Sequence, residues 1–78
     1  MTLILTGMNK FQRKQYKLHK QELLSGLKLW EKKGRPMGYL PYKLDNERYV
    51  LFVTDYPGQI MVTLWDNKRQ YVCGVGVR

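Results

Sequence analysis

The chain has 78 residues, 44% of them hydrophobic and 13% aromatic, and carries a net charge of +8 from 14 lysines and arginines against 6 acids. This length predicts a single domain, residues 1–78, and the composition argues against a disordered chain. The longest apolar runs, Leu3–Leu5 and Tyr49–Val53, are too short to span a bilayer. Residues 1–8 also lack the basic n-region of a signal peptide, so we expect a cytoplasmic protein. With Cys73 as the only cysteine no internal disulfide can form, and we expect Cys73 to be a small buried hydrophobe.

Residues 1–8 begin with a short β-branched and apolar run that ends at Gly7. This pattern predicts either a short strand or a loosely docked terminus.

A helix is predicted over residues 9–33. Asn9 suits the N-cap, because its side-chain oxygen accepts from free backbone N–H groups, and Gly34 with Pro36 would end the helix. Ser25-Gly26 is a weak bend signal, so the helix is either continuous or hinged at Gly26. At 100° per residue the main apolar line, which should face the sheet, holds Tyr16, Leu23, Leu27 and Trp30. A thinner line nearly opposite holds Phe11, Leu18 and Leu29.

The same helix carries most of the charge. Residues 9–35 hold nine lysines and arginines against two acids, a net of +7, and no acid lies between Lys10 and Lys20. Stabilising i,i+4 Glu–Lys pairs therefore cannot form there. The cations on one arc of about 120° are Lys10, Arg13, Lys14, Lys17, Lys20, Lys28 and Lys32. A solvated helix face is the ordinary explanation, whereas phosphate binding would explain the missing acids.

The second half of the chain predicts a sheet. Residues 34–47 read as a connector or an edge strand, because Pro41 cannot donate to a central ladder. Residues 48–78 read as an antiparallel meander with short turns. The predicted fold class is α+β, with one long or Gly26-kinked basic helix packed on a three- to four-stranded antiparallel meander.

Alternation assigns the two faces of this meander. The face expected to receive the helix holds Ile60, Val62, Leu64, Tyr71, Cys73, Val75 and Val77. The opposite face, with Thr63 and Trp65, is expected to be partly open. Exposed aromatics there or in turns are candidates for stacking on unpaired bases, namely Tyr39, Tyr56 and Trp65. Trp30 and Phe52 are instead expected in the core.

No catalytic or metal signature is present. His19 is the only histidine and, with one cysteine, cannot complete a metal site, so we expect no metal and no cofactor. Gly74-Val75-Gly76 is not a phosphate loop, since no helix follows it; glycines on one strand face are more typical of a bulge or a close backbone approach.

The functional hypothesis is a non-catalytic nucleic-acid-binding protein, for DNA or RNA, with phosphate contacts from the helix and limited sequence specificity. One alternative is a small inhibitor or regulator, of the kind that phages and mobile elements encode, which docks the basic helix on an acidic protein. Another is a small toxin-like ribonuclease in which His19, a tyrosine or an arginine would transfer protons. Membrane binding is disfavoured because the helix lacks a second broad apolar face. The line of Phe11, Leu18 and Leu29 would be exposed on a monomer and buried in a symmetric homodimer.

Overall fold

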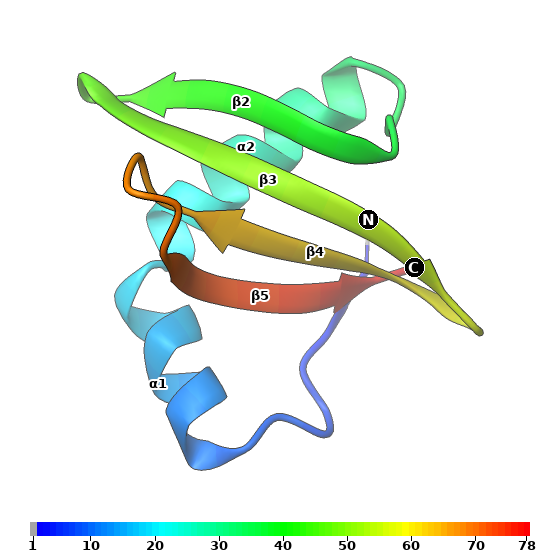
Figure 1. The fold of residues 1–78 in the computed structure, drawn as a ribbon. Coiled ribbons are helices and arrows are strands. Elements are labelled where there is room, and N and C mark those ends of the chain that lie inside the picture. Colours follow the sequence, from blue (N-terminus) through cyan, green and yellow to red (C-terminus); the bar gives the residue numbers. More distant parts are fainter. Residues whose placement is uncertain (1) are drawn as a thin grey trace.

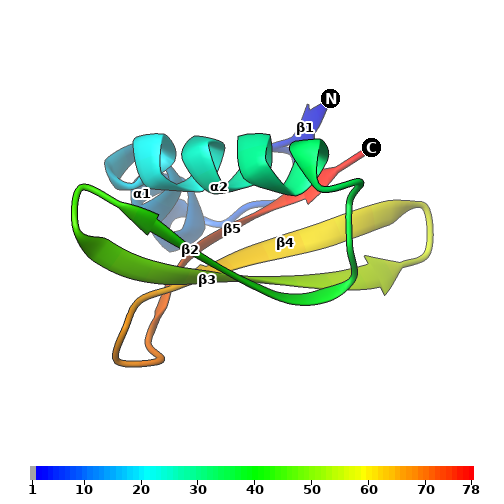
Figure 2. The same ribbon diagram turned by 90° about the horizontal axis from the view of Figure 1, so that it is seen from above.

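The computed structural model describes residues 2–78, so Met1 of the predicted segment 1–8 lies outside it. The elements in chain order are β1 (Leu3–Ile4), α1 (Lys10–Leu18), α2 (Lys20–Lys32), β2 (Gly38–Leu44), β3 (Glu47–Tyr56), β4 (Gln59–Trp65) and β5 (Tyr71–Val77). The strands form one antiparallel sheet in the order β1-β5-β4-β3-β2. Both helices cover the same face of this sheet, and the other face is open (Figures 1 and 2). The prediction of an α+β fold is confirmed.

The sheet has five strands, so the predicted three or four were too few. The additional strand is β1, in which Leu3 and Ile4 pair with Val77 and Gly76 at the end of β5. Of the two alternatives for residues 1–8, the structure thus shows the short strand, whose partner lies at the other end of the chain. Strand β2 is the opposite edge of the sheet, a position where Pro41 is tolerated because an edge strand leaves N–H groups unpaired.

The predicted long helix is two helices, and the break lies at His19 rather than at Gly26. His19 leaves the helical region with φ −116° and ψ 22°. A straight helix over residues 9–33 would be about 37 Å long, whereas the longest extent of the Cα trace is 32 Å. The break lets α1 lie beside β5 while α2 crosses the sheet toward β2 (Figure 1). Gln15 of α1 donates from Nε2 to the carbonyl oxygen of Val72 at 3.2 Å, which ties α1 to β5.

The core lies between the helices and the covered face of the sheet. The predicted apolar line supplies its helical half, because Tyr16, Leu23, Leu27 and Trp30 are all buried. The indole Nε1–H of Trp30 donates to the carbonyl oxygen of Pro36 at 2.9 Å, so this buried polar atom is satisfied. The strand residues of the core are Leu40, Leu51, Val53, Val62, Leu64, Val72, Cys73, Val75 and Val77. Burial raises the pKa of the Cys73 thiol to about 12, so Cys73 is a packing residue and not a nucleophile.

A β-bulge moves Tyr71 to the face opposite the predicted one. Leu64 pairs with Cys73 but Trp65 pairs with Tyr71, so Val72 is an extra residue in β5. One inserted residue reverses the alternation beyond it. Tyr71 therefore lies beside Trp65 on the open face, with 5.6 Å between the ring centroids.

Candidate nucleic-acid interface

The first group of candidate residues lies on α1, whose start is fixed by a capping box. The side chain of Asn9 accepts from the N–H of Gln12 at 2.8 Å, and the side chain of Gln12 accepts from the N–H of Asn9 at 3.0 Å. Tyr16 is turned into the core, and the part of the helix surface away from the sheet faces solvent. It carries four cations at i, i+3, i+4 and i+7, which are Lys10, Arg13, Lys14 and Lys17.

The second group lies on α2, and the break at His19 brings part of it against α1. A shallow groove at this elbow is lined by Lys17 from α1 and by Lys20 and Lys28 from α2, with Leu18 and Leu24 between them. Lys32 continues the row one turn beyond Lys28. The seven predicted cations are all exposed, but they do not form one straight arc, because the two helices have different axes (Figure 1).

The two acids of the helices, Glu22 and Glu31, do not pair with the seven cations. Arg35 donates to Glu31 through both Nε and Nη2, and this contact holds the pKa of the Glu31 carboxyl below its usual range. Glu22 is partly buried, with Oε2 4.0 Å from Nδ1 of His19. Within residues 2–78, none of the seven cations forms an ion pair with a carboxylate. Their charge is therefore available to an external anion.

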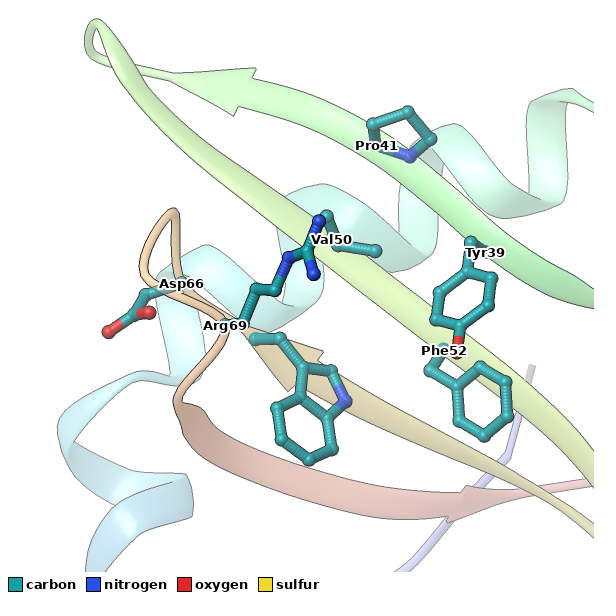
Figure 3. Close-up of a pocket in the computed structure, with 7 residues that line it drawn as sticks. Tyr39, Pro41, Val50, Phe52, Asp66 and Arg69 are labelled. Carbon is teal, nitrogen blue, oxygen red and sulfur yellow. The ribbon is translucent and has the colours of Figure 1, made fainter.

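The open face of the sheet carries a second candidate surface, a hollow over β2, β3 and β4 (Figure 3). Tyr39 and Phe52 are cross-strand partners with ring centroids 4.8 Å apart. Phe52 does not lie in the core, because Leu51 and Val53 on either side of it occupy the covered face, but it is half-buried and packs on the open face of the sheet. Tyr39 is 76% exposed. The residues that line the hollow are Tyr39, Pro41, Val50, Phe52, Trp65, Asp66 and Arg69.

Hydrogen bonds hold Trp65 in this hollow. Its indole Nε1–H donates to the Thr63 hydroxyl at 2.9 Å, and that hydroxyl donates to the carbonyl oxygen of Phe52 at 3.2 Å. Tyr71 packs against the indole with an interplanar angle of 79°. The volume of the hollow, about 640 Å³, falls within the range of about 300–1,000 Å³ that holds small-molecule-sized groups.

The β4–β5 turn positions Arg69 at the edge of this hollow. Asp66 Oδ1 accepts from the backbone N–H groups of Lys68 and Gln70, each at 2.9 Å. Arg69 takes a positive φ of 61° within this turn, and its guanidinium extends toward Val50 (Figure 3). Arg69 is one of the cations interleaved with the aromatic residues in the sequence, but its position at this hollow could not be predicted, since a turn residue gives no alternation from which its direction follows.

The structure separates the three predicted stacking residues. Tyr39 and Trp65 line the same hollow. Tyr56 also faces the open side, but it pairs with Gln59 at the β3–β4 turn, four residues along β3 from Phe52. Tyr56 thus lies outside the hollow and can serve as an exposed control.

Metal sites, membrane spans and similarity to known proteins are further indications of a protein's function. Within residues 2–78 there is no group of three or more potential metal-ligating side chains. None of the helices in that part of the chain has the length and apolarity needed to cross a membrane. No family model matches the chain, and neither a curated protein nor a solved structure is significantly similar to it.

Proposed function

We propose that this protein binds nucleic acid without catalysis, through phosphate contacts made by the cations of α1 and α2. The observation that carries the proposal is a cationic helix surface with no acidic counterpart. Seven exposed lysines and arginines lack carboxylate partners within residues 2–78, and three of these lysines meet at the elbow groove. Unpaired cations on adjacent helical turns repel one another, a cost that a phosphate backbone removes when it releases its counterions.

The proposal predicts a steep dependence of affinity on salt. Lys10, Arg13, Lys14, Lys17 and Lys20 can engage about four duplex phosphates, which gives a slope of log K against log salt of roughly −3 to −4. Replacing Lys14 and Lys17 with glutamine should weaken binding to unrelated sequences alike and make this slope shallower by about two units. Fluorescence anisotropy of a labelled duplex measures both quantities.

A matched control distinguishes the loss of contacts made by the helix surface from a general loss of positive charge. Lys68 and Arg78 are also exposed but lie outside the helices, so the variant Lys68→Gln/Arg78→Gln removes the same two charges. It should retain most of the wild-type slope. The labelled strand should remain intact throughout, since no reaction is proposed. Strand cleavage that is lost in a His19→Ala variant would instead favour the ribonuclease hypothesis.

An acidic protein partner would use the same cations. Absence of binding to random DNA and RNA at about 50 mM salt would overturn the nucleic-acid proposal and favour that partner. Conversely, if a protein bound to the helices is displaced by free nucleic acid, the two ligands share this surface.

A further inference from the structure

The strand positions on the open face of the sheet carry cations but no acids. In β2 and β3 the positions that face away from the helices include Lys43 and Arg48, whereas Glu47 and Asp55 have the opposite parity in β3. The corresponding positions of β4 and β5 hold no acid either. This face is therefore positive as well as aromatic, although it lies on the opposite side of the sheet from the helices (Figure 2).

Three of these cations lie together beside the aromatic hollow. Lys43 and Arg48 are direct cross-strand partners, an arrangement of like charges that destabilises a sheet. With Arg69 they line a second hollow. Asp66 also borders it, but Asp66 Oδ1 accepts from two backbone N–H groups and its carboxylate points away from Arg69 (Figure 3). The three cations thus have an uncompensated charge that suits a phosphate.

The two hollows adjoin, because both are bordered by Pro41, Val50, Asp66 and Arg69. An aromatic subsite next to a cationic subsite matches the base and the phosphate of one nucleotide. We propose that the open face binds single-stranded nucleic acid, with an unpaired base against Tyr39, Phe52 and Trp65 and the adjacent phosphate at Lys43, Arg48 and Arg69.

The choice of a single strand follows from the aromatic subsite. Bases in a duplex are stacked on each other, so only an unpaired base offers its face to a protein ring. Tyr39 exposes most of its ring, and the hydrogen bonds of Trp65 and the Asp66 turn fix the rest of the site in advance. A proline-rich peptide also uses aromatic grooves, but it would leave the three cations without a role.

This inference rests on the proposed function for its ligand class, but it uses a different surface. Since the helix cations and the open face lie on opposite sides of the sheet, substitutions on the two surfaces should have additive effects on the binding free energy. Binding at one surface can therefore be lost while binding at the other is kept, so each proposal can be tested separately.

The test uses labelled oligomers of about eight nucleotides, oligo-dT and oligo-U, with fluorescence anisotropy. Tyr39→Ala should weaken binding about 5- to 150-fold, the loss that follows removal of one stacking ring. Tyr39→Phe should restore it, because the ring is kept. Tyr56→Ala is the matched control, since Tyr56 is 58% exposed on the same face but outside the hollow. It should bind as the wild type does.

Two further readouts address the subsites separately. Trp30 is fully buried, so a change in tryptophan emission on adding the oligomer should report on Trp65. Lys43→Gln/Arg48→Gln should make the salt slope shallower by about one unit, given roughly 0.7 per single-strand phosphate. The same variant should fold at least as stably as the wild type, because it removes the like-charge pair.

The outcomes separate the two proposals. If Tyr39→Ala binds oligomers as the wild type does while Lys14→Gln/Lys17→Gln weakens duplex binding, the open-face inference is overturned and the proposed function stands. Loss with Tyr39→Ala but not with the lysine variant would support the open face and reject the helix contacts. A change in Trp65 emission with a proline-rich peptide but with neither oligomer would also overturn the inference.

Discussion

The ring of Tyr42 lies directly against the backbone of α2. A Cβ at Gly26 would be 2.8 Å from both Cε1 and Cζ of this ring, closer than real Cβ atoms approach a neighbour. The ring has little room to retreat, because its hydroxyl donates to the carbonyl oxygen of Glu22 and its other side stacks on Tyr49 at 5.6 Å. Burial accordingly raises the pKa of the Tyr42 hydroxyl. Gly26 is therefore needed for close packing of α2 on β2, and α2 continues through it.

Gly26→Ala should destabilise the protein. Alanine improves helix propensity by about 1 kcal/mol, but overpacking costs typically 1–3 kcal/mol, so the net loss should be about 1 kcal/mol. Urea unfolding of the wild type and the variant measures this difference. In a Tyr42→Leu background, where the ring is gone, the same substitution should instead be stabilising. A Gly26→Ala variant more stable than the wild type would show that Tyr42 moves aside.

At the scale of elements, the sequence predicted the buried residues and the two outer ends of the helical segment, at Asn9 and Lys33, but not its division into two helices. Tyr16, Leu23, Leu27 and Trp30 share one line in the sequence, and all four are buried. The break at His19 has no glycine or proline to signal it. It follows from tertiary packing, since α1 and α2 contact different strands, and sequence pattern alone does not contain that information.

In the strands, too, the sequence pattern predicted some side-chain directions correctly and others wrongly. Alternation predicted the covered residues Val62 and Leu64 of β4 correctly. It was wrong for Tyr71, because one extra residue in β5 reverses the direction of the side chain before it. For Phe52, aromatic character suggested the core, whereas its position between Leu51 and Val53 already placed it on the other face. For Phe52, alternation along β3 predicts the correct face of the sheet, whereas aromatic character does not.

The packing of α2 on the sheet predicts a large cost for cavities at their contact. Leu27 and Val62 are both fully buried, so Leu27→Ala and Val62→Ala should each destabilise the protein by about 2–4 kcal/mol. Leu18→Ala is a matched control, because Leu18 is 62% exposed and should change stability by only about 0.5 kcal/mol or less. Thermal and urea unfolding measure all three. Unchanged melting temperatures in the first two variants would contradict the observed core.

At the scale of the whole molecule, residues 9–35 carry a net +7 of the total charge of +8, while Lys43, Arg48 and Arg69 form a smaller group of cations at the open face. The sequence predicted which helix residues would be exposed cations, because the helical period separates them from the apolar line. It did not predict that Lys17, Lys20 and Lys28 meet in one groove, which depends on the break at His19. Nor did it predict that Lys43, Arg48 and Arg69 converge, which depends on strand pairing and on the β4–β5 turn.

The distribution of charge also bears on self-association. Phe11 and Leu18 are 61% and 62% exposed and lie two turns apart on α1. The prediction of an exposed line is wrong for Leu29, which is half-buried against the core because α2 has a different axis from α1. A symmetric dimer would bury Phe11 and Leu18, but it would also bring Lys14 of the two copies close together. Salt screens this repulsion, so we expect the dimer fraction to rise between about 50 and 500 mM salt, while nucleic-acid binding falls over the same range. Light scattering measures the association, with Phe11→Gln/Leu18→Gln as the variant that should stay monomeric. A mass of 9.3 kDa for the wild type at every salt and protein concentration would rule out this dimer and leave both apolar side chains exposed to solvent.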